Sequence, residues 1–293
     1  MTQPSRPSEA PTCPACDART GWWDLGDNTL LARCPRCGHI VRDLRYSSGP
    51  VRGHAWGGSA TFDKVRIALT MQRMRPLLPT GKRARILELG FGRGLMARQF
   101  LEAGHEVHGI EAGMLDVDID PVVRERATLH FGRAEHIDLP RDHFDLVYGI
   151  HVIEHLDDPQ RVFDKLAVSL APGGRFYFVT PNAESMGLEI FRDAWWNLED
   201  PTHLNFFSGR SLTRMLEKAG FHDVRVEIPV LDSITIEANS AVKRLFRASR
   251  RHGIMSNPFV KLLDLGLVAP TLAARAVAPR LSPSIDVRGT KRG

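Results

Sequence analysis

The sequence predicts an α/β protein in which a parallel sheet is covered by helices on both faces. Short apolar runs alternate with helical patterns from residue 85 onwards, as in chains built from repeated strand–helix–strand units. The first apolar run ends in a glycine-rich loop that opens a helix, which is typical of the carboxyl edge of a parallel sheet. With 43% hydrophobic and 25% charged residues, the composition excludes a disordered or fibrous chain.

Apolar periodicity and stop signals place the individual elements. Strands are expected at 85–89, 106–111, 144–150, 175–180, 224–228 and 285–288. Helices are expected at roughly 62–78, 95–103, 159–170 and 208–219, the last with Ser208 as its amino-terminal cap and Gly220 as its stop. About fifty residues of helical character precede the last strand, and Pro270 is expected in the first turn of a separate short helix there.

Composition and motifs divide the 293 residues into six segments. The first twelve residues, rich in Pro, Ser and Thr, are expected to be disordered. The others are a four-cysteine module at 13–45, a linker and helical cap at 46–80, the core at 81–232, a helical insertion with basic and apolar residues at 233–282, and the last strand of the core at 283–293.

The four cysteines form two closely spaced pairs. Two residues separate the members of each pair, and the pairs are Cys13 with Cys16 and Cys34 with Cys37. Four thiolates complete the tetrahedral shell of a structural zinc ion and leave no open position for catalysis. A redox dithiol and free core cysteines are the alternatives, but two such pairs in one short segment favour Zn²⁺.

The positive charge is concentrated at the carboxyl-terminal end of the chain. From Lys243 onwards there are eleven Lys or Arg residues against two acidic ones, whereas residues 1–242 carry a net charge of −4. Residues 243–280 therefore predict either a helical cap with a solvated basic face or a surface for an anionic membrane or a lipid-linked acceptor. The first residues show no signal-peptide pattern, so the expected location is cytoplasmic, with a peripheral membrane location as a further candidate.

A glycine-rich loop, ELGFGRG, follows the first strand of the core at residues 88–94. Its glycines let the backbone approach a ligand closely. Their spacing differs from the G-x-G-x-x-G pattern of dinucleotide sites. Glu111 ends the second strand, where a carboxylate can accept hydrogen bonds from both hydroxyls of a ribose. A tight turn without a ligand is the alternative.

Several motifs in this order resemble the class I S-adenosylmethionine-dependent methyltransferases, over roughly residues 85–231 and the last strand. They are ELGFGRG, HGIEAG, the stretch from GRAEHID to VIEHL, and LAPGGRFYFVTPN. The segment DPTHLNFFS at 200–208 is similar to the subgroup with ubiquinone-biosynthesis O-methyltransferases and sugar or natural-product methyltransferases. The resemblance implies a Rossmann-like seven-stranded sheet and S-adenosyl-L-methionine as cofactor.

The resemblance also implies which residues bind that cofactor. Glu111 would bind its ribose, and Ile150 would lie near its sulfonium. The residues beside its methionine part would be Glu88, Gly90, Gly92 and Gly94, and those beside its adenine Ala134 and Glu135.

His151 and His203 are the candidate catalytic residues, because methyl transfer to oxygen or nitrogen needs a base that removes the acceptor's proton. Glu154 and His155 match a cation-binding pair of the ubiquinone-type enzymes, but His151 replaces a further carboxylate there. We therefore expect a methyltransferase for a small-molecule or glycan acceptor, acting at oxygen. The alternatives are an RNA methyltransferase that holds nucleic acid with the zinc module and basic tail, and a non-catalytic scaffold.

Overall fold

The computed structural model describes residues 9–26, 29–47, 60–113, 118–245 and 258–292. The chain forms two compact units. Unit 1 contains Met1–Val51, Pro181–Ser211 and Glu227–Ile285, and unit 2 contains Arg52–Thr180, Leu212–Val226 and Asp286–Gly293. Residues 1–8 of the predicted disordered start and residues 48–59 of the predicted linker lie outside the described residues.

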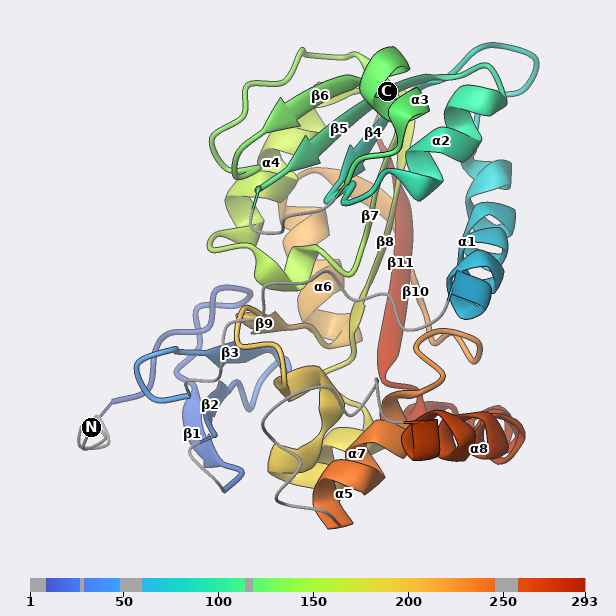
Figure 1. The fold of residues 1–293 in the computed structure, drawn as a ribbon. Helices are drawn as coiled ribbons and strands as arrows, with labels where there is room; N and C mark the ends of the chain where they lie inside the picture. Colours follow the sequence, from blue (N-terminus) through green and yellow to red (C-terminus); the bar gives the residue numbers. More distant parts are fainter. Residues whose placement is uncertain (1–8, 27–28, 48–59, 114–117, 246–257, 293) are drawn as a thin grey trace. The chain divides into compact units, whose positions relative to one another are not determined.

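Unit 2 is built on a seven-stranded sheet with the strand order β10-β11-β8-β7-β4-β5-β6 (Figure 1). The ladders between β8, β7, β4, β5 and β6 are parallel. The strands are β4 Arg85–Leu89, β5 Glu106–Glu111, β6 Thr128–Phe131, β7 Phe144–Ile150, β8 Leu170–Pro181, β10 Phe221–Glu227 and β11 Ser284–Lys291. The predicted α/β fold with a seven-stranded, mostly parallel sheet is confirmed.

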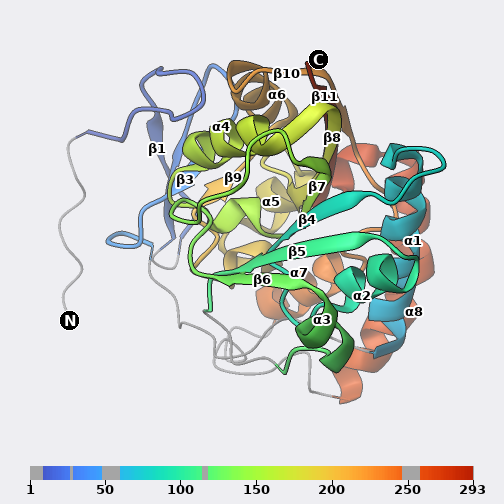
Figure 2. The same cartoon turned by 90° about the horizontal axis from the view of Figure 1, so that it is seen from above.

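Helices cover both faces of this sheet (Figures 1 and 2). One face carries α1 Ala60–Met74, α2 Leu95–Glu102 and α3 Pro121–Arg126, and the other carries α4 Pro159–Ser169 and α6 Gly209–Lys218. The short 3₁₀ helices are η1 Arg75–Leu77 and η2 Ile153–His155. The α1–α3 face buries apolar side chains from helices and strands together, among them Met74, Phe100, Val123, Leu146 and Tyr148.

Some details of this unit differ from the sequence expectation, and β10, for example, begins at Phe221 and not at Val224. Strand β8 begins at Leu170 and includes the residues expected as a turn at 171–174, where the ladder to β7 shifts register. The sequence did not predict β6 or α3. Helix α3 begins at Pro121, and the carboxylate of the preceding Asp120 caps it by accepting from the Val122 N–H.

Unit 1 contains a four-stranded antiparallel sheet, β1-β2-β3-β9. Its strands are β1 Gly21–Asp24, β2 Leu30–Arg33, β3 Ile40–Arg42 and β9 Asn205–Phe206. Ile40 of the cysteine segment pairs with Phe206, far along the chain, and both are buried in one apolar cluster with Leu31 and Trp195. The four-cysteine segment therefore shares a sheet and a core with the segment that follows β8.

The same unit contains α5 Met186–Phe191, α7 Ile236–Leu245, α8 Pro258–Val277 and the 3₁₀ helices η3 Arg192–Ala194, η4 Trp196–Leu198 and η7 Pro279–Leu281. The prediction that Pro270 starts a separate helix is wrong, because α8 runs through it. A proline deprives the carbonyl four residues earlier of its hydrogen bond. That residue is Gly266, and both positions are exposed, so water can satisfy the carbonyl.

Several basic side chains of the insertion are bound within unit 1. Arg275 is fully buried and pairs with Glu237, Lys243 pairs with Glu199, and Arg244 lies 3.7 Å from Asp193. Arg247, Arg250 and Arg251 lie outside the described residues. The electrostatic contact with an anionic membrane therefore stays a prediction. Fewer basic side chains of the insertion are available for it than the sequence suggested, because Arg275, Lys243 and Arg244 lie beside acidic residues.

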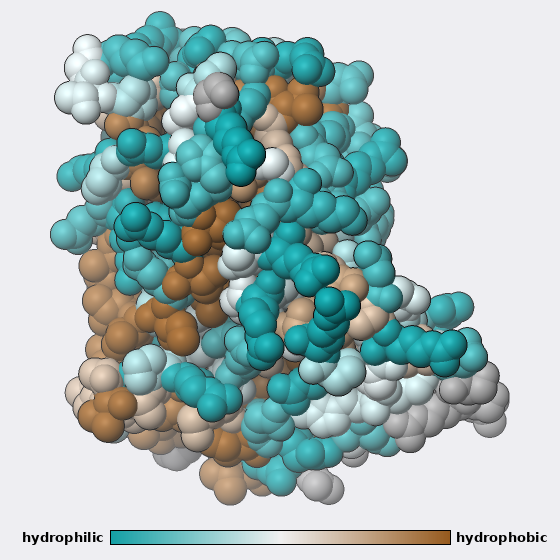
Figure 3. Space-filling view, turned by 180° about the vertical axis from the view of Figure 1, so that it is seen from behind, coloured by the Kyte–Doolittle hydropathy of each residue, from teal (hydrophilic) through white to brown (hydrophobic). Residues whose placement is uncertain are grey.

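Helix α8 exposes apolar side chains instead, including Leu262, Leu265 and Val277. Apolar residues gather at the lower left of Figure 3, on the side where the turned molecule shows α8. Within the described part of the chain, no helix has both the length and the apolar character needed to cross a membrane.

Candidate active site and four-cysteine cluster

The glycine-rich loop joins β4 to α2 at the carboxyl end of the strand. Gly90, Gly92 and Gly94 all have positive φ, a backbone conformation that other residues rarely adopt. Space also requires two of them. A Cβ at Gly90 would lie 2.7 Å from Val152, and one at Gly94 would lie 2.9 Å from Val123. The loop thus packs against Val152, which follows β7, and against Val123 of α3.

Glu111, the last residue of β5, lies beside this loop. Its Oε2 accepts a hydrogen bond of 2.8 Å from the Gly92 N–H. β5 is the parallel neighbour of β4, so the two strands end at the same edge of the sheet. The structure therefore brings a carboxylate to the glycine loop, as a ribose-binding role requires.

Glu88 is buried in β4, two residues before the loop. Burial raises the pKa of Glu88 to about 8, although the nearby Tyr148 hydroxyl lowers it. Its Oε2 is buried without a hydrogen-bond partner among the described residues. A nearby positive charge would stabilise the ionised form of such a buried carboxyl group. The amino group of an amino-acid moiety could supply that charge.

The loop after β6 carries the two residues expected near an adenine. Glu135 is buried, and its Oε1 accepts a 3.0 Å hydrogen bond from the Asp157 N–H. The Ala134 carbonyl accepts from Lys165, whose ammonium group also binds the Glu135 carbonyl. The Glu135 side chain thus fixes the chain after β7, so any adenine contact falls to its backbone or to Ala134.

Phe131, the last residue of β6, was not singled out in the sequence. The residue is 61% exposed, and its ring meets that of Phe91 in the glycine loop edge-on, with 5.9 Å between ring centroids. An exposed aromatic residue at the end of a strand beside a glycine loop is the signal that could have found it. It offers a flat apolar surface to a planar ligand.

His151 follows Ile150, the last residue of β7, and has a positive φ of 54°. Its N–H donates to the Val179 carbonyl, which anchors this backbone on β8. Its Nδ1 lies 3.5 Å from Oε1 of Glu154, whose side chain is fully buried. The Thr180 hydroxyl donates to Oε2 of the same carboxylate. Strained conformations of this kind cluster at functional sites.

A family profile described as a methyltransferase domain matches residues 61–226, more than half of the chain. The chain belongs to this methyltransferase family. Solved structures agree in fold. The phosphoethanolamine N-methyltransferase 2 of Haemonchus contortus in complex with S-adenosyl-L-methionine aligns with a TM-score of 0.53 and 20% identity, over 78% of this chain and 53% of that one. The [4+2]-cyclase SpnF aligns with a TM-score of 0.52 and 18% identity, over 83% and 89%.

Curated relatives match part of this methyltransferase. The malonyl-[acyl-carrier protein] O-methyltransferase of Enterobacter lignolyticus is 33% identical over 45% of this chain and 52% of its own length. The ubiquinone biosynthesis O-methyltransferase of Coxiella burnetii is 27% identical over 35% of this chain and 46% of its own length. The matched segments thus span about half of these relatives.

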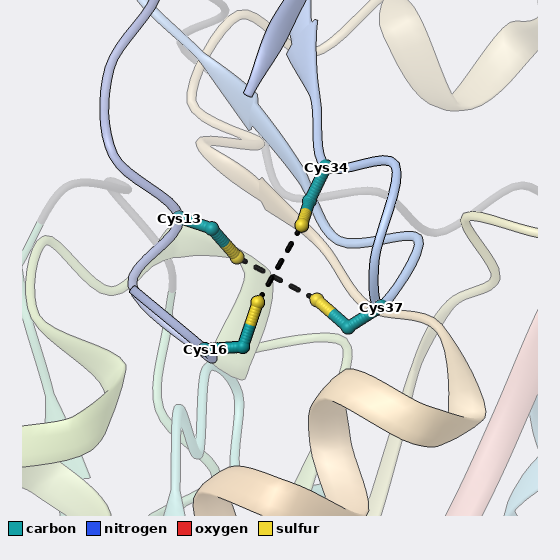
Figure 4. Close-up of side chains that lie close together, drawn as sticks. All are labelled: Cys13, Cys16, Cys34 and Cys37. Carbon is teal, nitrogen blue, oxygen red and sulfur yellow. Dashed lines mark hydrogen bonds between the residues drawn. The ribbon is translucent and has the colours of Figure 1, made fainter. Parts of the chain in front are cut away.

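The four cysteines of the methyltransferase converge in unit 1 (Figure 4). All are buried, and their sulfur atoms lie within 4.8 Å of one another. The Sγ atoms of Cys13 and Cys37 are 3.5 Å apart, as are those of Cys16 and Cys34. Zn–S bonds of 2.3 Å at tetrahedral angles place sulfurs about 3.8 Å apart, so the cluster has the dimensions of a zinc site.

The second cysteine turn is held from two sides. Gly38 has a positive φ, and a Cβ there would lie 3.2 Å from Ser208. The Ser208 hydroxyl donates to the Cys37 carbonyl and accepts from the Ser211 N–H, which confirms its predicted role as the cap of α6. Burial opposes ionisation of Cys34, but the N–H groups of Cys37 and Arg36 lower its pKa to about 7. This thiol is thus the one most ready to bind a metal as thiolate.

His203 belongs to unit 1 and follows the short helix η4. Its Nδ1 lies 2.7 Å from the Asn197 carbonyl oxygen, which can only accept, so Nδ1 carries a proton. The aromatic side chains Trp195, Trp196 and Phe206 are buried in the core of this unit. They support the unit rather than line an open surface.

Replacing Glu88 with Gln is expected to increase the free energy of unfolding relative to the unmodified protein, and this difference is expected to grow as pH rises. Between pH 4.5, the ordinary pKa, and about 8, folded Glu88 keeps a proton that the unfolded chain loses. The folded state then binds more protons, so the stability falls with pH, by at most about 1.4 kcal/mol per unit. Thermal melts at pH 5, 6.5 and 8 should show a growing advantage of Glu88→Gln. A constant difference, as expected for the exposed control Glu125→Gln, would contradict the assignment.

Proposed function

We propose that this chain transfers the methyl group of S-adenosyl-L-methionine to an oxygen of a small-molecule or glycan acceptor, with His151 as the base. The observation that carries the proposal is the pair of His151 and Glu154 at the carboxyl end of β7, next to the glycine loop. Val152, directly after His151, packs against Gly90 of that loop. The candidate base and the candidate cofactor loop thus belong to one local structure.

The residues of unit 2 fit the cofactor chemically. Gly92, where a Cβ would meet nothing within 4 Å, leaves open space beside the loop backbone, and Glu111 already accepts from the Gly92 N–H, as it would from a ribose hydroxyl. The uncompensated Glu88 offers a partner for the amino group of the methionine part. When bound, S-adenosyl-L-methionine supplies a methyl group activated by the adjacent sulfonium.

The work of the protein is then to align the acceptor and to take its proton. His151 Nε2 would accept the proton of the acceptor hydroxyl, while Nδ1 faces Glu154. The carboxylate, oriented by Thr180, fixes the tautomer and stabilises the imidazolium that forms. Glu154 was considered in the sequence only as a cation ligand. Its spacing of three residues from His151 is the signal for the role proposed here.

Several observations support a small acceptor at oxygen. The two relatives described above are O-methyltransferases by name. The RNA alternative relies on free basic side chains, whereas Lys243 and Arg275 are paired internally. His203 remains a second proposed acceptor-side residue, and the contact of its Nδ1 with the Asn197 carbonyl orients its ring. A screen of phenols, sugar nucleotides and RNA for formation of S-adenosylhomocysteine tests the acceptor class, and turnover of RNA alone would overturn it.

We also propose that Cys13, Cys16, Cys34 and Cys37 hold one structural zinc ion, supported by their sulfur–sulfur distances and burial. Four protein ligands leave no position open for substrate. The ion would fix the turn that Ser208 braces, and with it the start of α6.

Replacing Glu111 with Ala is expected to weaken binding of S-adenosyl-L-methionine by about 10- to 150-fold. Hydrogen bonds to a charged group contribute about 1.5–3 kcal/mol, which corresponds to that range of affinity. Isothermal titration calorimetry on the folded variant gives the dissociation constant. The exposed Glu125, replaced with Ala, serves as the matched control and should bind as the unmodified protein does. Equal affinity of both variants would remove Glu111 from the cofactor site.

A further inference from the structure

Two histidines and a glutamate cluster at the amino edge of the parallel sheet, away from the cofactor loop. Glu106 is the first residue of β5, His108 lies two residues along it, and His143 directly precedes β7. Glu106 Oε1 lies 3.2 Å from His108 Nε2 and 3.8 Å from His143 Nε2. Glu111, at the other end of β5, is about 16 Å away at 3.3 Å per residue.

The three atoms have the spacing of ligands on one metal ion. All lie within 4.8 Å of one another. Ligands at about 2.0–2.2 Å from a common ion are roughly 3.0–3.6 Å apart, so small side-chain rotations bring the set into place. Imidazole nitrogen with carboxylate oxygen suits Zn²⁺ and neighbouring first-row ions, whereas Mg²⁺ and Ca²⁺ prefer oxygen alone.

The environment prepares the rings for this role. Phe144 meets both imidazoles edge-on, at 5.1 Å from His108 and 4.9 Å from His143. His143 Nε2 is buried without a hydrogen-bond partner among the described residues, which is costly unless something binds it. The His143 and Glu106 side chains are 27% and 37% exposed, so the cluster lies near the surface of unit 2.

Two arginine side chains compete with a cation at this position, and one of them, Arg83, has its Nη2 3.9 Å from Glu106 Oε2. Arg85 Nη1 lies 3.4 Å from His143 Nδ1, and a guanidinium can only donate, so the neutral ring carries its proton on Nε2. Metal binding at Nε2 requires this proton to move to Nδ1 and Arg85 to turn away. Asp145, whose carboxylate is 3.6 Å from Arg85 Nε, can hold the released side chain. Arg85 therefore weakens the site without blocking it.

We propose that Glu106, His108 and His143 bind a divalent transition-metal ion such as Zn²⁺, at a site separate from the four cysteines and from the cofactor loop. Because β4 lies between β5 and β7 in the sheet, the ion would clamp three neighbouring strands at their amino ends. Binding to the folded state alone raises the melting temperature in proportion to the logarithm of free metal.

The test uses the full chain with a total zinc content of one equivalent, verified by elemental analysis, and titrates it with further Zn²⁺ by calorimetry. We expect a second, weaker equivalent and a rise in melting temperature. His143→Gln and Glu106→Gln should each weaken this second equivalent about tenfold or more, since even loss of a residue that only orients a ligand costs 10- to 100-fold. His130→Gln is the matched control, because His130 stacks on His108 but is not one of the three ligands.

Arg85→Gln should have the opposite effect and increase the affinity for the second equivalent of Zn²⁺, because it removes a competing guanidinium. Circular dichroism verifies that each variant is folded, and the two ligand variants test the site independently. A wild-type stoichiometry that stays at one, or a second equivalent that survives both ligand variants, would overturn the proposal.

Discussion

Cys34→Ser is expected to abolish zinc binding and to unfold the four-stranded sheet of unit 1. Its strands contain only two to four residues each, too few to be stable without the metal or the shared core. Zinc contributes about 10–16 kcal/mol in small zinc-finger peptides. Here the apolar cluster around Trp195 remains, so the loss should be smaller but still the largest of any single substitution.

Elemental analysis of fresh, reduced protein should give about one zinc per chain before the second-site titration, and none at the cysteines in Cys34→Ser. Thermal unfolding should show an early transition in that variant, while the parallel sheet of unit 2 melts later. Arg36→Ser is the matched control, because Arg36 is an exposed residue of the same turn and is not a ligand. Absence of metal in the unmodified protein, or identical melting of the two variants, would show that the cluster does not hold zinc.

His151→Asn is expected to reduce turnover by about 10²–10⁴-fold while leaving the affinity for S-adenosyl-L-methionine unchanged. Asparagine is the informative substitution because it tolerates the positive φ of this position, so a loss reflects chemistry and not backbone strain. The base acts in the transition state and the cofactor binds through other residues, which separates the two effects.

The measurement is the rate of S-adenosylhomocysteine formation with the acceptor found in the screen, together with calorimetry for the cofactor. His222→Asn, in β10, is the matched histidine control and should keep full turnover. Glu154→Gln should lose less than His151→Asn, because it leaves the base in place but weakens its orientation. Full turnover in His151→Asn would transfer the role of base to His203 or to another group.

The sequence alone determined the central strands and the local motifs. Strands β4, β5 and β7 lie at the residues that apolar runs predicted, because each run is short, buried and bounded by turn residues. The cysteine spacing predicted that four sulfurs meet, and the glycine loop and Glu111 were placed at one sheet edge, since parallel strands end together. These features depend on neighbours within a few residues or on the regular geometry of one sheet.

Tertiary structure decided what depends on partners distant in sequence. The two-residue strand β9 exists only because β3 lies beside it. Helix α8 continues through Pro270, and Gly266, whose carbonyl loses its partner, is exposed to water. The sequence offered Glu154 as a cation ligand, and only the structure shows that its carboxylate also lies 3.5 Å from His151. The meeting of Glu106 with His143 is invisible along the chain, because 36 residues separate them and only the sheet order brings their strands together.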